Sequence, residues 1–317
     1  MYKNDLAIVS PILTNIAIGY SNATFVANRL LPEVRVQSQT GNIMKWGKDS
    51  FLTYNTLRAP RGDNNIVDPS FATTIGYVCD EHSLTTPLDI KQEINVAADP
   101  QQLKFANTKK LRNNLLLSLE YDKLTYLQNT DNYGASNKTT LLDDFLNEDA
   151  VNPILYLKTK MDYLASNMIG LLPNLMVCNY KVLSYILNNP KTRAYFTNNT
   201  PADVIPTKES VAKLLGLSEI IVANAKYSTN KSTFLDIWGN KILLLYSSTP
   251  TGTESASEFL PNFGYTLLYQ PVYVDTFPNP GNTIEYIRCT EVSTYKITGS
   301  DAGYLITNPI DPTVYSA

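Results

Sequence analysis

Histidine is nearly absent from this sequence, in which His82 is the single example among 317 residues. Histidine is the usual general acid or base near neutral pH. His82 lies in the stretch CDEHSL, where a strand is predicted, and no serine or cysteine nucleophile motif lies nearby. The Gly-rich patterns G-x-G-x-x-G and G-x-x-x-x-G-K-S/T, which cradle phosphates, are missing as well. The sequence therefore predicts no catalytic residue, no cofactor and no enzyme.

Cysteine is scarce too. Cys79, Cys178 and Cys289 are isolated and odd in number, which excludes a disulfide framework or a cysteine-rich metal site. We expect all three to be reduced core residues. The acidic pairs Asp143-Asp144 and Glu148-Asp149 lack the spacing and the glycine of an EF-hand. We interpret them as a solvated loop and predict no metal.

Long apolar runs are also missing. No stretch of about 18 apolar residues occurs, so we expect no membrane-spanning helix, and the N-terminus lacks the features of a signal peptide. The net charge of −3 and the pI near 5.3 exclude a general attraction of the surface to nucleic acid or anionic lipid. Tyrosine, in contrast, is abundant, with 21 residues against 14 glycines. Tyrosine suits large, partly wet contact surfaces and also β-rich proteins, so both interpretations stay open.

The first third of the chain predicts an N-terminal segment followed by a two-stranded excursion. Residues 1–45 contain only short apolar groups, with a short helix expected near 6–18, so this segment either lies on another element or is poorly ordered. Residues 44–58 and 71–84 are predicted to be strands, with the tip of the excursion near Arg61–Asn65. A lone two-stranded ribbon is marginal in water, so we expect it to lie on something else.

Charge is divided along this part of the chain. Positions 29 to 61 hold six basic residues against two acidic ones, whereas positions 62 to 100 hold seven acidic residues against one basic one. Either the two limbs neutralise each other, or a basic edge of one copy meets an acidic edge of a neighbouring copy. On the second interpretation, the candidates for contacts between subunits are Arg29, Arg35, Lys45, Trp46, Lys48, Arg58, Arg61, Asp63, Asp80 and Glu81.

The clearest single element is a long helix, predicted from Asp99-Pro100 to about Asn129. Asp99 is a suitable N-cap, Pro100 fits the first helical position, and the residues that follow contain no glycine and many strong helix formers. Its apolar residues form two stripes, which indicates packing on two sides. The wide stripe contains Phe105, Leu111, Leu115, Leu116, Leu119, Tyr126 and Leu127, and the smaller one contains Leu103, Ala106, Leu117, Tyr121 and Leu124.

Residues 152–247 predict alternating helices and strands, as in a compact α/β unit. Asn152-Pro153 begins a one-sided amphipathic helix, and Thr207 caps a helix that ends at Gly216. The stretch FLDIWGNKILLLY predicts a hairpin that turns at Gly239-Asn240. From residue 263 onward the pattern is of β type.

Several stretches carry a resemblance through their order and spacing. They are FVANRLLPEVRVQSQTG, YVCDEHSLTTPLDIKQEINVAADP, NTKKLRNNLLLSLEYDKLTYL with Glu120 near its end, PNLMVCNYKVLSYILNNPKTRAYF, GLSEIIVANAKYST, WGNKILLLY and EVSTYKITGSDAGYLITNP. Together they cover nearly the whole chain, and it resembles the major capsid proteins of tailed bacteriophages, which have the Hong Kong 97-type fold.

The resemblance implies an α+β fold with defined parts. An N-terminal arm would occupy 1–45 and an extended loop 46–90. A peripheral domain would combine 91–150, including the long helix as the family's spine helix, with the C-terminal β part at 263–317. An axial domain would be inserted at 151–262.

The resemblance also implies a function and partners. The chain would be a coat protein that self-assembles through pentamers and hexamers into an icosahedral shell around a DNA genome, located in the virion capsid and assembled in the bacterial host cytoplasm. Its partners would be other copies, a portal, a decoration protein where one exists, and packaged double-stranded DNA held without sequence-specific binding; no membrane is involved. Many relatives carry an N-terminal scaffolding extension, whereas this chain begins with the arm. We therefore expect a separate scaffolding protein or a chain already trimmed.

Two alternatives remain open from the sequence. A bacterial encapsulin shares the fold and would enclose cargo enzymes instead of DNA. A monomeric hydrolase or sugar-binding enzyme is the alternative from another class, and the single histidine argues against it. Some relatives cross-link lysine to asparagine between subunits, but no such pair can be matched here.

Overall fold

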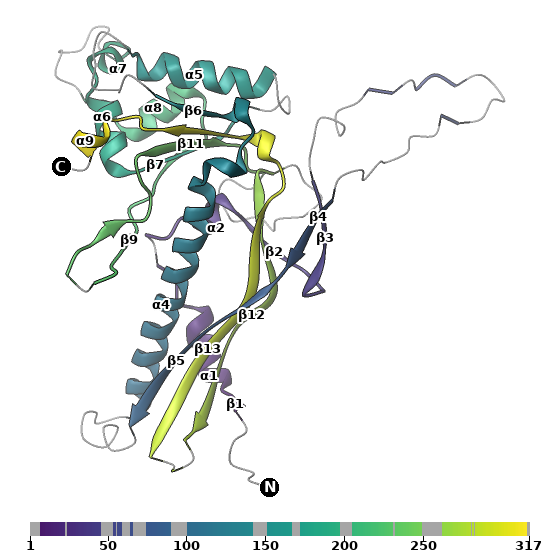
Figure 1. The fold of residues 1–317 in the computed structure, drawn as a ribbon, viewed down its shortest axis with the longest axis vertical. Helices are drawn as coiled ribbons and strands as arrows, with labels where there is room; N and C mark the ends of the chain where they lie inside the picture. Colours follow the sequence, from purple (N-terminus) through teal and green to yellow (C-terminus); the bar gives the residue numbers. More distant parts are fainter. Residues whose placement is uncertain are drawn as a thin grey trace.

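One long helix connects two five-stranded sheets in this chain (Figure 1). The computed structural model describes residues 7–22, 24–45, 53–54, 56–58, 64–65, 74–89, 100–141, 151–166, 172–196, 205–230, 232–248, 262–279, 281 and 283–315. Helices and sheets are mixed throughout these residues, which confirms the expected α+β class.

The long helix is α4, which runs from Pro100 to Gln128 and confirms the predicted element. Its partners change along its length. Leu111, Leu115 and Leu119 are buried in a core with the first sheet, whereas Leu124 and Leu127 are buried in a core with the second. Both predicted stripes contribute to both cores, because Leu103 and Phe105 pack on the first core and Leu117 and Tyr126 on the second. The helix therefore joins the two sheets.

The first sheet has three long strands and two short ones at one edge. The long strands are antiparallel, with β13 in the middle. The outer edge of β12 pairs with β2 in parallel at residues 266–268 and with β1 at residues 275–276. Pro271, which has no N–H to donate, lies between these two pairings. The strands are β5 (Asp80–Asp89), β13 (Ile284–Ile297), β12 (Gly264–Pro278), β2 (Glu33–Arg35) and β1 (Ile8–Val9).

Two helices cover one face of this sheet. Helix α1 (Pro11–Ile18), capped by the Ser10 side chain, buries Leu13 and Ala17. These two residues pack with the middle of α4 against Val274 and Ile287 of the sheet. The predicted short helix near residues 6–18 is thus confirmed, although it begins at Pro11.

The second sheet is buried on both faces. Alternate residues point to opposite sides, as strand geometry requires. Met176, Ile242 and Leu244 face one core, whereas Val177 and Leu243 face the other. Double burial explains why its central strand is a continuous apolar run. In order, the strands are β6 (Lys138–Thr140), β14 (Gly303–Thr307), β11 (Lys241–Leu245), β7 (Leu175–Cys178) and β8 (Glu219–Val222).

Helices with well-formed ends cover one face of the second sheet. The Asn152 side chain accepts from the N–H of Leu155 at 3.2 Å, and the Thr207 side chain accepts from the N–H of Ser210 at 3.3 Å. Gly216 has a φ of 77°, the left-handed conformation that glycine adopts at little cost. These three predicted helix ends are confirmed. The helices of residues 151–315 are α5 (Pro153–Leu164), α6 (Tyr180–Asn188), α7 (Pro190–Ala194), α8 (Lys208–Leu215) and α9 (Pro312–Tyr315).

The second sheet combines strands from distant parts of the sequence. Strand β6 comes from the expected 91–150 part and β14 from the expected 263–317 part, yet both lie in the second sheet beside β11. Pairing between strands distant in the sequence decides this, and the β pattern of each strand carries no information about its partner.

The two-stranded excursion begins earlier than predicted. Strand β3 (Thr40–Met44) pairs antiparallel with β4 (Thr74–Val78). The prediction of a strand at 44–58 was therefore wrong at its start, and the described residues between 53 and 58 are not in a strand. The strand expected at 71–84 is divided at Cys79, which is buried; β4 pairs with β3, and β5 joins the first sheet.

The hairpin expected at Gly239-Asn240 is also corrected. Strand β10 (Leu235–Asp236) pairs with β9 (Lys226–Tyr227), whereas β11 pairs with β7 and β14 on its two sides. The apolar side chains of β11 are buried on both faces because the strand lies in the middle of the sheet. A two-stranded ribbon with β10 would leave them exposed.

Replacing Leu115 or Leu119 by alanine should lower the free energy of unfolding by about 2–5 kcal/mol, because each is 3% exposed and its loss leaves a cavity. Leu155→Ala is the matched control on α5, where the side chain is 59% exposed, and its effect should stay within about 0.5 kcal/mol. Urea unfolding of the soluble subunit, followed by circular dichroism, measures the difference. Equal midpoints for all three variants would contradict the buried position of α4.

Candidate functional site

A buried carboxylate holds the N-terminal segment, residues 7–22 and 24–45, on α4. Glu120 is 4% exposed, and its carboxylate accepts from the N–H groups of Val26 at 2.7 Å and of Ala27 at 3.1 Å. These groups lie at the start of the short helix α2 (Ala27–Leu30), where no side chain of the segment caps the helix. The N–H groups at a helix start lack partners within the helix, so Glu120 supplies the cap from another element.

Lys123, beside Glu120, and Arg112 add two cations of α4 to a buried charged cluster. The Lys123 ammonium donates to Asn28 Oδ1 at 2.7 Å, and Arg112 forms an ion pair with Glu291 of β13 at 2.8 Å. Burial raises the pKa of Glu120, although the two N–H bonds and Lys123 oppose this shift. Burial likewise lowers the pKa of Lys123, although Glu33, Glu291 and Glu120 oppose it. The cluster therefore links the N-terminal segment, α4 and the first sheet.

Arg29 has a partner within its own chain. It forms an ion pair with Glu219 at the start of β8, and both side chains are 37% exposed. The pair connects the N-terminal segment to the second sheet. Arg29 is also one of the residues expected to contact another subunit, and that expectation stays a prediction.

The other candidate contact residues are partly described. Arg35 at the end of β2, Lys45 just after β3 and Arg58 are all exposed. Asp80 and Glu81 begin β5 and are exposed as well. Within the subunit, none of these three basic residues forms an ion pair with either of these two acidic residues. Trp46, Lys48, Arg61 and Asp63 lie outside the described residues.

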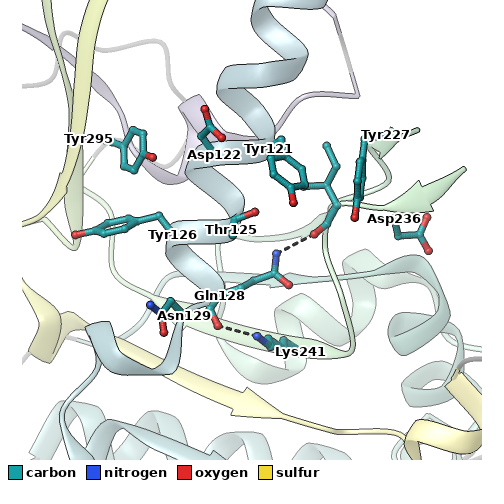
Figure 2. A pocket seen from close by; sticks show the side chains of 11 residues that line it. Tyr121, Asp122, Thr125, Tyr126, Gln128, Asn129, Tyr227, Asp236, Lys241 and Tyr295 are labelled. Carbon is teal, nitrogen blue, oxygen red and sulfur yellow. Dashed lines mark hydrogen bonds between the residues drawn. The ribbon is translucent and has the colours of Figure 1, made fainter. Parts of the chain in front are cut away.

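A groove lined by tyrosines lies beside the C-terminal end of α4, opposite the hairpin of β9 and β10 (Figure 2). Tyr121 of α4 packs on Tyr227 of β9, with ring centroids 4.7 Å apart, and Tyr126 packs edge-on against Tyr295 of β13 at 5.1 Å. We call this site, which has a volume of about 600 Å³, the tyrosine groove.

Polar contacts fix the floor of the tyrosine groove. The Gln128 side chain donates to the carbonyl of Ile237 at 2.9 Å and accepts from the N–H of Gly239 at 2.9 Å. The Lys241 ammonium donates to the Gln128 carbonyl at 2.7 Å, at the partly negative end of α4, and Figure 2 draws this bond. Asp122 and Thr125 also line the groove. The site is thus a rigid, aromatic surface with polar edges.

Little in the sequence indicates this groove. Tyr121 and Tyr126 fall on different stripes of the predicted helix, while Tyr227 and Tyr295 lie more than a hundred residues further along the chain. The abundance of tyrosine was the only signal, and it did not indicate which tyrosines meet.

In the residues that the structure describes, no group of three His, Cys, Asp or Glu side chains is placed to hold a metal ion. His82 lies in β5 opposite Glu291 of β13. The three cysteines are buried and unpaired, and burial raises the pKa of Cys178 to about 12. In the part of the chain that the structure describes, no helix is both long and apolar enough to cross a membrane.

Two variants of Glu120 should separate its hydrogen bonds from its charge. Glu120→Ala leaves two buried N–H groups without an acceptor and should lower the free energy of unfolding by about 1–3 kcal/mol. Glu120→Gln keeps a carbonyl acceptor and should cost less. Urea unfolding at neutral pH measures both, and an alanine variant as stable as the glutamine variant would contradict the capping role.

The same pair of proteins tests the pKa of Glu120. Because its folded pKa is raised, its contribution to stability is present at low pH and is lost as the pH rises through that pKa. The unfolding free energy of the parent minus that of Glu120→Gln should therefore decrease as the pH rises from 4.5, the ordinary value. A difference that stays constant or grows would show that burial does not raise the pKa.

Comparisons with known proteins cover almost the whole chain. No family model matches it. It is 32% identical over 308 residues to the major capsid protein of Burkholderia phage BcepMu. The matched region covers 96% of this chain and 97% of that protein. It is 26% identical over 260 residues to the major capsid protein of Pseudomonas phage JBD67, spanning 79% of this chain and 81% of that protein.

Solved structures agree on the fold. A phage-related protein from Bordetella bronchiseptica RB50 matches with a TM-score of 0.76 and 23% identity, over 97% of this chain and 99% of that one. An encapsulin from Synechococcus elongatus matches with a TM-score of 0.50 and 11% identity, over 96% of both chains. The encapsulin likeness concerns the fold alone, whereas the sequence identity lies with the phage proteins. This chain belongs to the family of major capsid proteins of tailed bacteriophages.

Proposed function

We propose that this chain is the coat protein of a tailed phage, which self-assembles through pentamers and hexamers into an icosahedral shell around double-stranded DNA. The observation that carries the proposal is the 32% identity to a phage major capsid protein over 96% of the chain. Its location would be the virion capsid, assembled in the host cytoplasm. A structural role without enzyme activity is part of this proposal, and the names of the curated relatives support it.

The parts of the family fold can be assigned on this proposal. Helix α4 would be the spine helix, and the first sheet with α1 and α4 would form the peripheral domain. The second sheet with α5, α6 and α8 would form the axial domain. Sheet pairing supports moving residues 138–140 and 303–307 from the peripheral to the axial domain. Residues 1–39 would be the arm, and residues 40–78, from the start of β3 to the end of β4, the extended loop.

The physical argument for assembly comes from the extended loop. Strands β3 and β4 form a separate two-stranded sheet, which packs on β12 and β13 of the first sheet through Ile43, Ile75 and Tyr77. Figure 1 shows this ribbon beside the first sheet. Such a ribbon buries little apolar area by itself and is marginal alone. Tyr54 is 50% exposed and Leu57 is 84% exposed, so this part offers apolar surface for another copy to cover.

The proposed contacts between subunits keep the charged candidates that face solvent. These are Arg35, Lys45 and Arg58 on the basic side and Asp80 and Glu81 on the acidic side. The candidates that remain from the sequence are Arg29, which is paired with Glu219 inside the subunit, and Trp46, Lys48, Arg61 and Asp63. A separate scaffolding protein, a portal and a decoration protein are further proposed partners. The slightly acidic chain would hold packaged DNA without strong phosphate binding.

Shell formation is the first prediction from this proposal. Expressed together with the scaffolding protein of its own phage, the chain should form capsomers or closed shells that sediment far ahead of a 35.4 kDa monomer. Sucrose-gradient sedimentation and negative-stain microscopy measure the outcome. A protein that stays monomeric at high concentration, with scaffold present and at every salt concentration tried, would refute the proposal.

Shortening the extended loop should separate folding from assembly. We expect that replacing residues 60–69 by a short Gly-Ser link leaves the unfolding transition of the subunit nearly unchanged, because it keeps Ile43, Ile75 and Tyr77, through which the ribbon packs on the first sheet. Shells should fail to form or should be fragile, since their clasp is missing. Circular dichroism checks folding and sedimentation checks assembly. Shells as heat-stable as those of the parent would mean that the loop is no clasp.

A further inference from the structure

We propose that Lys123 and Asn28 form an isopeptide bond within one subunit, with release of ammonia and with Glu33 as the group that carries the proton. The bond joins the N-terminal segment covalently to α4. It lies inside a single chain and does not connect two subunits. It therefore goes beyond the shell-forming function and does not depend on it.

The surroundings of Lys123 are unusual for a lysine. Its side chain belongs to a residue that is 3% exposed, and lysine is rarely so buried unless an opposite charge pairs with it. Among the described residues, no carboxylate forms an ion pair with Lys123. Its hydrogen bond goes instead to a neutral amide, Asn28 Oδ1, at 2.7 Å. A desolvated amine beside a carbonyl group is the environment in which lysine acts as a nucleophile.

Burial also favours the reactive form of this amine. Only the neutral amine has the lone pair that attacks a carbonyl carbon. Burial lowers the pKa of Lys123, although the carboxylates around it oppose this shift, and Arg112 of the same helix lowers the pKa further. The neutral amine is therefore more populated near neutral pH than in an exposed lysine.

Glu33 contacts the nitrogen that has to leave. Asn28 Nδ2 donates to Glu33 Oε1 at 2.7 Å, while Asn28 Oδ1 accepts from Lys123. An amide nitrogen leaves only when it receives a proton, and a carboxylate in contact with it can take that proton from the attacking amine. The amide is thus held at both ends by the two groups that the reaction needs, which removes much of the entropic cost of bringing them together.

Glu120 is a positioning residue for this reaction. Its carboxylate accepts from the N–H of Ala27 at 3.1 Å, and Ala27 directly precedes Asn28. Glu120 and Lys123 are three residues apart on α4, so they lie on the same face of the helix. One face of α4 therefore carries both the group that fixes the start of α2 and the nucleophile.

The atoms balance without a further reactant. The bond between Lys123 Nζ and Asn28 Cγ forms, and the bond between Asn28 Cγ and Nδ2 breaks. Nδ2 leaves as ammonia, with its own two hydrogens and one that Glu33 transfers from Nζ, and Glu33 ends in its starting state. Asn28 is exposed, so the ammonia escapes into water.

Mass spectrometry of the intact full-length chain tests the bond. The parent should weigh about 17 Da less than its sequence, which is the mass of ammonia. After proteolysis, fragmentation should locate this loss in a branched peptide that joins the stretches around residues 28 and 123. A folded parent that keeps the full mass of its sequence after several days at neutral pH would overturn the proposal.

Three variants assign the roles. Lys123→Arg keeps the positive charge without the nucleophile and should abolish the loss, whereas Lys110→Arg, the matched control at an exposed position of α4, should keep it. Glu33→Gln still offers an oxygen to Asn28 Nδ2 but carries no proton. It should slow bond formation by about a hundredfold, as followed by the mass of freshly expressed protein over time. Formation at the parent's rate would overturn the role of Glu33.

Two further outcomes are distinguishable. An asparagine can also lose ammonia when a backbone nitrogen attacks its side chain, so a loss that persists in Lys123→Arg would overturn the isopeptide bond. If that variant does not fold, the presence or absence of the branched peptide in the parent decides. A parent that carries the bond but forms no shells would refute the shell-forming function alone.

Discussion

The burial of charge beneath the N-terminal segment is the constraint on which the rest of the fold depends. Removing a carboxylate from water is costly unless donors replace the water, and Glu120 meets this condition only while Val26 and Ala27 hold their backbone N–H groups against it. If the segment left α4, the Glu120 carboxylate would lose the two N–H donors that replace water around it. Lys123 adds a second tie through Asn28. The N-terminal segment is therefore part of the folded core.

The core at the junction shows the same interdependence in apolar form. Leu30 and Leu31 from the N-terminal segment, Leu124 and Leu127 from α4 and Trp238 are all fully buried and share one cluster with the second sheet. No single element could bury these side chains alone. Stability is consequently shared between residues distant in sequence, and the two sheets are expected to unfold together, as cooperative single units do.

Short sequence patterns predicted many helices and their ends, whereas the sequence did not predict which strands pair or which distant side chains meet. The extent of α4, the caps at Asn152 and Thr207 and the glycine at the end of α8 follow from short-range chemistry, and each is in the structure. The β11 run was predicted as half of a hairpin because its neighbours in space, β7 and β14, are distant in sequence. The tyrosine groove was missed for the same reason, since its four tyrosines come from three elements that are distant in the sequence.

Helix α4 also has a mechanical consequence. Its 29 residues span roughly 43 Å at about 1.5 Å per residue, with one end fixed in the junction core and the other reaching across the first sheet. A tilt of about 5° at the fixed end would displace the far end by roughly 4 Å, from the same rise per residue. The helix thus works as a lever, which can convert a small repacking around Leu124 and Leu127 into a large displacement of the first sheet. In a subunit built in this way, the angle between the two sheets can change to suit the curvature of a shell, while both sheets keep their internal hydrogen bonds.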